Sequence, residues 1–311
     1  MNGPSAPPVV LTGATGFVGS AAVPLFLEHG LPLRVLSRRA VDLPGVDLRV
    51  VPESDERALA QALDGVQVVC HLAGRAHITA PRQQQQDRFD TVNVDGSRRL
   101  ARAAFRGGVR RLVFVSSIGA VGSASTPGHP LGENDPCRPT SAYGRSKRKA
   151  EVYLREEADR HGAELVIIRP PLVHGPGAPG NLALLGRLVS RGVPLPLAGV
   201  ENLRSLIHVR NLARVLAAAV TVPDAAGRTF HVRDRVDYST PQIIAAAGQP
   251  TGRRARLFRA PLPAVRVAAT IAGRGAALEQ LTGWLQVNDR SARCVLGVHP
   301  EDLPLEIGTE S

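Results

Sequence analysis

Short apolar runs alternate with longer segments of helical periodicity along the N-terminal half of the chain. The apolar runs have the length of strands, and runs of this kind are typical of a parallel sheet that helices cover on both faces. The strands that the pattern predicts are residues 9–11, 33–36, 48–51, 66–72, 111–115 and 165–168. One predicted helix follows the first strand and ends near residue 28, and two more cover residues 90–107 and 143–161. This alternation predicts an α/β fold built on a doubly wound parallel sheet.

A glycine-rich turn joins the first predicted strand to the first predicted helix. Gly13, Gly16 and Gly19 are spaced three residues apart in this turn. In such a turn the first glycine permits a tight bend, the second lets the backbone approach a pyrophosphate, and the third packs the helix on the strand. Amides at the helix N-terminus then attract phosphates. The turn predicts a dinucleotide site on a Rossmann-type sheet, with contacts from Gly13, Thr15, Gly16, Phe17, Val18 and Gly19.

The tip of the second predicted strand indicates which dinucleotide binds. In this fold an acid near that tip accepts the ribose hydroxyls, whereas an arginine accommodates a 2′-phosphate. Here Ser37 and Arg38 follow the strand and no acid stands beside them. A hydroxyl and a guanidinium bind phosphate through charge-assisted hydrogen bonds, so the tip favours NADP over NAD. The alternative is that Arg38 and Arg39 are two ordinary surface arginines.

A tyrosine and a lysine stand four residues apart where the long helix of residues 143–161 begins. At this spacing Tyr143 and Lys147 share one helical face. A phenol alone is a poor base, but a nearby ammonium favours the phenolate, so the pair suits proton transfer at a carbon–oxygen bond. Ser116 and Ser117 follow the strand 111–115, at the sheet edge where ligands of such folds bind. The alternative is an ordinary pair on a helix surface.

The composition changes towards proline and glycine beyond Pro170, particularly over residues 174–180. We therefore expect a flexible N-terminal tail over residues 1–8 and a dinucleotide-binding domain over 9–170. Residues 171–311 are expected to form mainly a substrate-binding lobe, and a segment near 204–232 is expected to return to the first domain.

Charge and cysteine content change this picture little. The net charge is +11, but the 38 basic residues, only two of them lysines, are spread along the chain, which argues against a nucleic-acid partner. The three cysteines form no CxxC pair, so neither a metal site nor a disulfide framework is predicted. Arginines interrupt the apolar stretches of the C-terminal half, and we expect no membrane partner. A cytoplasmic enzyme fits these observations.

In combination, these residues resemble the extended short-chain dehydrogenase/reductase family, in its NAD-dependent epimerase/dehydratase branch that acts on nucleotide sugars. The resemblance extends from Val9 to about Pro300 and weakens after Ser239. The segments that carry it are residues 12–19, 71–74, 93–97, 116–122, 143–147, 169–171 and 204–211.

The resemblance implies a role for each matching residue. Ser117 would hydrogen-bond the reacting oxygen, Tyr143 would act as acid and base, and Lys147 would hold the nicotinamide ribose while lowering the pKa of Tyr143. Further cofactor contacts would come from Leu72, Ala73, Gly74, Asn93 and Pro170. Asn181 and Arg204 would contact a substrate diphosphate. A homodimer is expected by the same analogy.

The sequence also departs from the family pattern. Val121 replaces a tyrosine, Asn211 replaces an acid, and Leu172 stands where many sugar epimerases have asparagine. Family members that dehydrate sugars have an Asp-Glu pair after the active-site hydroxyl, but Ile118 and Gly119 follow Ser117 and cannot move a proton. A 4-keto reductase and a 4-epimerase both remain, with a slight preference for the reductase. The reduction of a non-sugar ketone and a non-catalytic role as a dinucleotide sensor also stay open.

Overall fold

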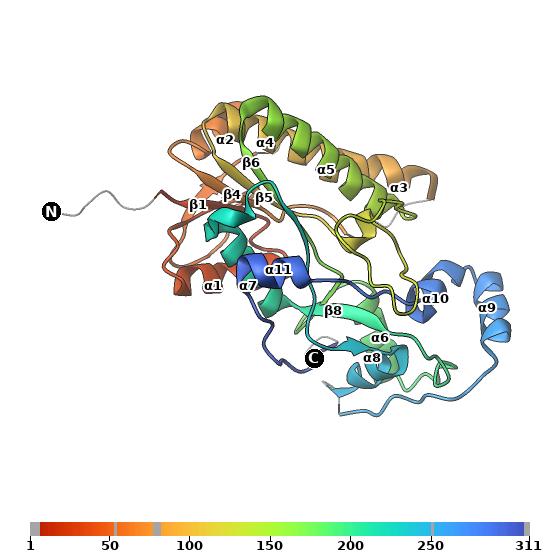
Figure 1. Cartoon of the computed structure of the whole chain (residues 1–311). Coiled ribbons are helices and arrows are strands. Elements are labelled where there is room, and N and C mark those ends of the chain that lie inside the picture. Colours follow the sequence, from red (N-terminus) through yellow and green to blue (C-terminus); the bar gives the residue numbers. More distant parts are fainter. Residues whose placement is uncertain (1–6, 53–54, 77–81, 250–251, 308–311) are drawn as a thin grey trace.

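A seven-stranded parallel sheet forms the body of the computed structural model, which describes residues 7–52, 55–76, 82–249 and 252–307 (Figure 1). Its strands are β1 Val9–Thr12, β2 Leu33–Ser37, β3 Asp47–Val50, β4 Val68–His71, β5 Arg111–Val115, β6 Glu164–Arg169 and β9 Thr229–His231. Their order is β3-β2-β1-β4-β5-β6-β9, and each strand pairs in parallel with its neighbours. The order reverses between β1 and β4, which is where sheets of this kind bind ligands.

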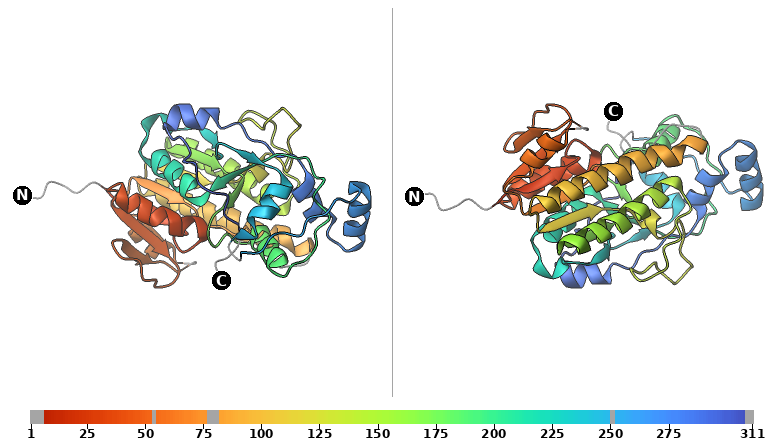
Figure 2. Two further views of the ribbon diagram at one scale, coloured as in Figure 1. Left: turned by 90° about the horizontal axis from the view of Figure 1, so that it is seen from below. Right: turned by 90° about the horizontal axis from the view of Figure 1, so that it is seen from above.

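Helices cover both faces of this sheet (Figure 2). One face is covered by α1 Phe17–Glu28, α7 Val209–Thr221 and α11 Arg290–Leu296, and the other by α2 Glu56–Ala62, α4 Gly96–Arg106 and α5 Ala142–His161. Each face has its own apolar core, because side chains of every central strand point alternately to the two layers. The predicted doubly wound α/β fold is confirmed.

The structure corrects several predicted boundaries. The helix expected over 90–107 starts earlier, as α3 Arg82–Phe89, passes through a wide π-helical turn, η1 Asp90–Asp95, and ends as α4. The short helix α2 was not predicted, since it has only 7 residues; the Asp55 carboxylate caps it by accepting from the amide of Ala58. Apolar periodicity locates an element but does not locate its ends, which depend on such local caps.

A smaller lobe follows β6. Its three-stranded sheet has the order β10-β8-β7, formed by β7 Leu172–His174, β8 Arg204–His208 and β10 Asp237–Tyr238. Its helices are α6 Asn181–Ser190, α8 Thr240–Ala246, α9 Leu262–Ile271 and α10 Gly275–Thr282, and it has a separate apolar core. From the segment that was expected to return to the first domain, α7 packs on α1 and β9 joins the main sheet, while β8 stays in the small sheet. Across the described ranges, no helix combines the length and apolarity needed to cross a bilayer.

A late segment of the chain fastens the lobe to the loop after β5. Leu285 and Val287 pack with Ile118 and Val121. Ile118 belongs to the short 3-10 helix η2 Ile118–Ala120. The amide of Ser205, in β8, donates to the carbonyl of Leu285 at 2.8 Å. The segment therefore holds the small sheet beside Ser117 and its loop.

The start of α5 is pressed against η2. The Ser141 hydroxyl caps the helix by accepting from the amide of Gly144 at 3.0 Å. A Cβ added at Gly144 would lie 2.2 Å from the carbonyl oxygen of Gly119, which no side chain tolerates. Glycine at this position lets Tyr143 approach the Ser117 loop.

We expect Gly144→Ala to lower the free energy of unfolding by about 1–3 kcal/mol, because the backbone of Gly119 would have to move. Gly96→Ala is the matched control, since it also lies at the start of a helix and a Cβ there meets nothing within 4 Å. The control should leave stability unchanged or raise it by less than about 1 kcal/mol. Urea unfolding of both variants checks this, and an equal effect on the two would contradict the packing argument.

Candidate active site

The glycine turn forms a close-fitting cradle at the carboxyl end of β1. Gly13 has a φ of 76°, in the left-handed region, and a Cβ on it would lie 2.7 Å from the amide nitrogen of Ala73. At Gly19 a Cβ would lie 2.1 Å from the carbonyl oxygen of Gly13. The first helix starts at Phe17 without a side-chain cap, which leaves its first amides facing the turn. This geometry fits a dinucleotide pyrophosphate.

A buried hydrogen-bond chain holds the neighbouring loop in place. The Ser97 hydroxyl donates to the carbonyl of Asn93 at 2.7 Å, so it accepts from Nε2 of His71 at 2.8 Å. Nδ1 of His71 then accepts from the Thr12 hydroxyl at 2.7 Å, and the Thr12 oxygen accepts from the amide of Ala73 at 3.2 Å. Burial, with a smaller effect of the Lys147 charge, lowers the pKa of His71 to about 3, so the ring is neutral. This chain positions the loop of Leu72, Ala73 and Gly74 against the glycine turn.

Ser117, Tyr143 and Lys147 meet at the carboxyl end of β5. The Ser117 side chain lies near enough to the Tyr143 phenol to lower the pKa of that phenol, and its hydroxyl accepts from the amide of Gly119 at 3.1 Å. Nζ of Lys147 donates to the carbonyl of Val115 at 2.9 Å and lies 4.7 Å from the ring centre of Phe114. The structure therefore brings together the three side chains that the sequence analysis proposed as catalytic.

Burial sets the protonation states of this pair. It raises the pKa of the Tyr143 phenol to about 12, although the neighbouring Ser117 side chain acts in the opposite direction. It also lowers the pKa of Lys147 to about 8, while the charge of Glu151 acts to raise it. In the protein alone, burial outweighs the effects expected to favour the phenolate. At neutral pH the phenol is protonated and the lysine carries its charge.

Asn93 supports the same site from the opposite side. It lies in the wide turn η1, and its side chain accepts from the amide of Arg75 at 2.8 Å and donates to the Ser146 hydroxyl at 3.0 Å. Next to it is Gly74, where an added Cβ would lie 3.1 Å from Oδ1 of Asn93 and 3.3 Å from Nζ of Lys147. The wide turn lets Asn93 link the cofactor-side loop to α5.

The other proposed cofactor contacts lie at the ends of β2 and β6. Ser37 ends β2, and its hydroxyl accepts from the amide of Arg39 at 3.3 Å, while Arg38 beside it is exposed. The carbonyl of Pro170 accepts from the amide of Ile118 at 2.9 Å, which places Pro170 beside the Ser117 loop.

Asn181 and Arg204 belong to the smaller lobe. The exposed side chain of Asn181, at the start of α6, donates to Gln280 at 3.3 Å. Arg204 donates to the carbonyl of Gly283 at 2.8 Å, and burial lowers its pKa to about 10. Among the described residues, no contact joins these two side chains to Ser117 or Tyr143, so the structure leaves their proposed role in substrate binding untested.

A buried ion pair next to the proposed catalytic side chains was not predicted. The carboxylate of Glu151 accepts from the Ser116 hydroxyl at 2.6 Å and from Nε and Nη2 of Arg169 at 2.8 and 2.7 Å. Despite burial, the hydrogen bonds and charge of Arg169 hold the pKa of Glu151 below its ordinary value. The available signal was spacing, because Glu151 follows Lys147 by the same four residues that separate Lys147 from Tyr143.

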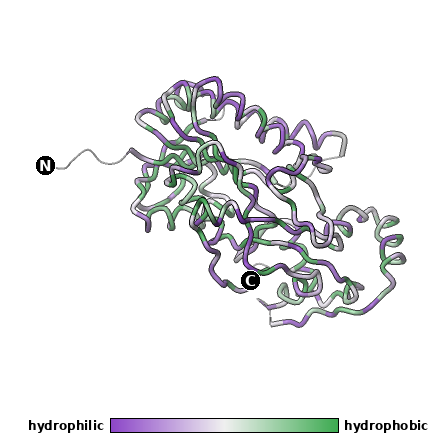
Figure 3. Tube along the Cα trace, in the orientation of Figure 1, coloured by the Kyte–Doolittle hydropathy of each residue, from purple (hydrophilic) through white to green (hydrophobic). Residues whose placement is uncertain are grey.

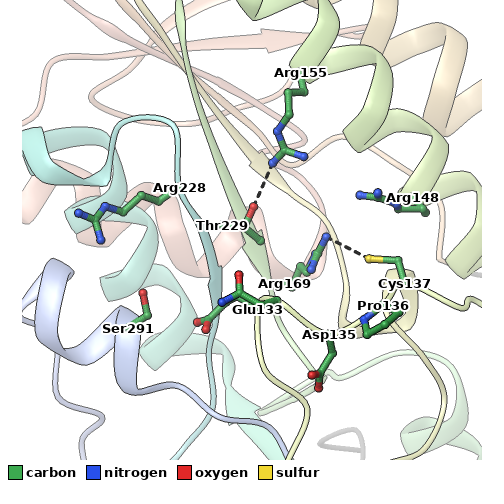
Figure 4. Close-up of a pocket in the computed structure, with 11 residues that line it drawn as sticks. Glu133, Asp135, Pro136, Cys137, Arg148, Arg155, Arg169, Arg228, Thr229 and Ser291 are labelled. Atoms are coloured by element: carbon green, nitrogen blue, oxygen red, sulfur yellow. Dashed lines mark hydrogen bonds between the residues drawn. The ribbon is translucent and has the colours of Figure 1, made fainter.

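Arg169 also lines a cavity of about 640 Å³ (Figure 4). There Nη2 of Arg169 approaches Sγ of Cys137 at 3.6 Å, and Arg155 donates to the Thr229 hydroxyl at 3.2 Å. None of the proposed catalytic or cofactor-binding residues lines this cavity. We therefore assign the site from the geometry of its side chains and not from the size of this cavity.

The fold and the site together define a dinucleotide-binding enzyme of the short-chain dehydrogenase/reductase type. The family model described as "NAD dependent epimerase/dehydratase family" matches residues 9–232, and the chain belongs to this family. The predicted family is therefore confirmed, as is the prediction of an epimerase or reductase enzyme.

Individual relatives have differing activities. The chain is 33% identical over 296 residues to the UDP-glucose 4-epimerase of Vibrio cholerae, a match that covers 94% of this chain and 90% of that protein. It is 31% identical to the ceramide reductase of Caulobacter vibrioides, over 85% of this chain and 76% of that one. Among solved structures, MoeE5 in complex with UDP-glucuronic acid and NAD matches with a TM-score of 0.74 and 26% identity, covering 95% of this chain and 94% of that chain.

We expect Glu151→Gln to destabilise the protein by about 3 kcal/mol at neutral pH, because the Arg169 charge would stay buried without its partner. Since the folded pKa of Glu151 lies below its ordinary value of 4.5, its stabilising effect is complete above that pH and is lost as the pH falls through the folded value. The difference between wild type and variant should therefore shrink on acidification. Urea unfolding at several pH values measures it.

Glu156→Gln is the matched control, since Glu156 is exposed on the same helix. We expect a change of less than about 0.5 kcal/mol there at every pH. A Glu151→Gln penalty that stays constant as the medium is acidified would show that the pair does not depend on charge.

Proposed function

We propose that the protein is a nucleotide-sugar oxidoreductase that interconverts a hydroxyl and a keto group at sugar carbon C4, as a 4-keto reductase or a 4-epimerase. The observation that carries this proposal is the meeting of the Ser117 hydroxyl, the Tyr143 phenol and the buried Lys147 ammonium at the carboxyl end of the sheet.

The cofactor would lie along the glycine turn. The turn at Gly13 would hold its pyrophosphate. The loop at Gly74 would lie against the nicotinamide, and the ammonium of Lys147 would bind the ribose. At both glycines the backbone leaves little room for a side chain, which fits a closely bound cofactor. Bound NAD or NADP would supply the hydride acceptor and donor.

Tyr143 is suited to move the proton. With a pKa near 12 the phenol keeps its proton at neutral pH, so it can donate to the oxygen of a keto group as the carbon is reduced. In the reverse direction the phenol must first lose its proton, and the Lys147 ammonium, four residues further along the same helical face, would favour the resulting phenolate. Ser117 would orient the same substrate oxygen by a second hydrogen bond.

The residues after Ser117 argue against sugar dehydration. Ile118 is buried with 4% of its surface exposed, and Gly119 has no side chain. Neither can remove or deliver a proton. A 4-epimerase and a 4-keto reductase both need only Ser117, Tyr143 and Lys147. They differ in whether the keto sugar rotates within the site before it is reduced again.

Two observations support a nucleotide sugar as the substrate. The Vibrio relative is named as a UDP-glucose 4-epimerase, and MoeE5 holds UDP-glucuronic acid beside NAD. In this chain, Arg204 and Asn181 of the smaller lobe are proposed to contact the diphosphate. A second candidate is the reduction of a non-sugar ketone, which the similarity to a ceramide reductase favours.

We also propose a homodimer formed through α4 and α5. Val152 and Tyr153 are each 39% exposed on the outer face of α5, and the guanidinium of Arg98, on α4, lies 5.0 Å from the centre of the Tyr153 ring. This apolar and aromatic face suits a helix-to-helix contact between two copies.

The function is tested by incubating the purified protein with UDP-glucose or UDP-N-acetylglucosamine and NAD, and separately with their 4-keto forms and NADH or NADPH. Consumption of the reduced cofactor supports the reductase, and sugar interconversion without net consumption supports the epimerase. If only a ceramide-like ketone is turned over and none of the sugars is, the protein reduces a non-sugar ketone, which is the second candidate function. Failure of every substrate in the presence of bound cofactor would overturn the proposal.

Tyr143→Phe removes the proton donor, and we expect kcat to fall about a hundredfold or more. The dissociation constant of the cofactor should stay within about twofold, because the phenyl ring and its packing on Phe89 are retained. Tyr153→Phe on the same helix is the control and should keep full activity. Steady-state kinetics and cofactor titration measure both, and full turnover by Tyr143→Phe would remove this residue from the mechanism.

We propose that Arg38 and Ser37 favour NADP over NAD, since a guanidinium and a hydroxyl stand where a carboxylate would repel the 2′-phosphate. Arg38→Ala should therefore weaken NADP binding about tenfold or more while changing NAD binding little. Arg39→Ala, next to it and also exposed, is the control. Calorimetric titration with both cofactors decides this, and equal losses for NADP and NAD would rule out the preference.

A further inference from the structure

Residues 252–275 are strongly basic and contain no acid. Six arginines fall in this segment, and no aspartate or glutamate accompanies them. All six are exposed in the structure, namely Arg253, Arg254, Arg256, Arg259, Arg266 and Arg274. This short segment therefore presents six positive charges and contributes no negative charge of its own.

The helix within this segment, α9, has two apolar faces. One face packs on the core of the smaller lobe through Leu262, Val265 and Ala269. The other consists of Ala264, Val267, Ala268 and Ile271, whose spacing of three and four residues places them on one side of the helix. The two large side chains of this second face, Val267 and Ile271, are 60% and 83% exposed. None of the ten residues of α9, all of them described, is buried.

This apolar face stands at one end of the molecule. In Figures 1 and 2, α9 and α10 project from the lobe at the end opposite to β1, and the hydropathy trace shows hydrophobic stretches in this projection (Figure 3). Phe258, 48% exposed, precedes the helix and is held by its amide, which donates to the carbonyl of Leu195 at 3.1 Å. The amide of Arg274 donates to Ala269 at 2.7 Å and fixes the other end of the helix. The exposed apolar side chains thus stand on an anchored support.

We propose that this surface, formed by Phe258, Val267, Ile271 and the six arginines, docks the protein on an anionic phospholipid bilayer. A helix that lies in a membrane interface needs an apolar face to enter the headgroup region and cations near it to meet the anionic lipids. α9 has the apolar face and Arg266, and the chain before and after the helix supplies the other five arginines. No spanning helix is needed, so the expectation of no membrane partner, which rested on the absence of spans, does not apply to surface binding.

Charge distinguishes a bilayer from the other possible occupants. A second copy that met this face symmetrically would bring two sets of six arginines together, and residues 252–275 supply no acid to offset them. A nucleic acid would pair with the arginines but would leave Val267 and Ile271 without an apolar partner. An anionic bilayer satisfies both the charge and the apolar side chains.

Vesicle flotation tests the proposal on the full chain. We expect the protein to float with vesicles of equal parts phosphatidylcholine and phosphatidylglycerol, to stay behind with phosphatidylcholine alone, and to dissociate as salt is raised. Val267→Ser combined with Ile271→Ser should weaken binding at least about tenfold, because the exposed apolar side chains are removed. Val50→Ser combined with Val236→Ser is the control, since these residues are also exposed but lie away from α9.

A second pair of variants separates local charge from the net charge of the whole chain. Arg266→Gln with Arg274→Gln should weaken vesicle binding about tenfold, whereas Arg57→Gln with Arg106→Gln, on α2 and α4, should change it less than about twofold. If both pairs of variants lost vesicle binding equally, the binding would depend only on the net charge of the chain, and the proposal would be overturned. It would also be overturned if the protein failed to float, or if the serine variants abolished self-association or nucleic-acid binding instead. Thermal unfolding of each variant verifies that it is folded.

Discussion

At Gly13 and Gly144 the backbone approaches another segment more closely than any side chain would permit, at 2.7 and 2.2 Å for an added Cβ. The first approach sets the glycine turn against the loop of residues 72–74. The second sets the start of α5 against the loop that follows Ser117. Both occur at the carboxyl edge of the sheet, and the positions of Tyr143 and Lys147 follow from them. The chemistry of the site therefore rests on a backbone arrangement that only glycine permits.

One face of α5 carries three polar side chains that contact the end of β5 and the residues after it. Tyr143, Lys147 and Glu151 follow each other at intervals of four residues, and their partners are successive residues at the end of β5. The phenol lies near Ser117, the ammonium donates to the carbonyl of Val115, and the carboxylate accepts from Ser116. Each buried charge or hydroxyl has a partner, which is how a polar stripe can pack against an apolar sheet without a large desolvation penalty.

Sequence patterns predicted the sheet, the helix layers and the proposed catalytic side chains, because strand burial, glycine spacing and helical periodicity are local signals. They did not predict the Glu151–Arg169 pair or the chain through Thr12, His71 and Ser97. These contacts join segments far apart in the sequence. The chain through His71 exists only once β1 and β4 are side by side, and the ion pair with Ser116 only once β5 and β6 are side by side. Element ends were also missed, as at η1, where a change in helix width leaves no mark on apolar periodicity.

The segment around Leu285 has a consequence for how the chain reaches its native state. It packs on Ile118 and pairs with β8, so the loop that carries Ser117 is completed by residues made long after it. The span that defines the family ends at residue 232, before this segment. A nascent chain that has passed β9 therefore contains every strand of the main sheet but not the residues that pack on the Ser117 loop. Because closure over such sequence separations is entropically costly, we expect the site to be completed late in folding.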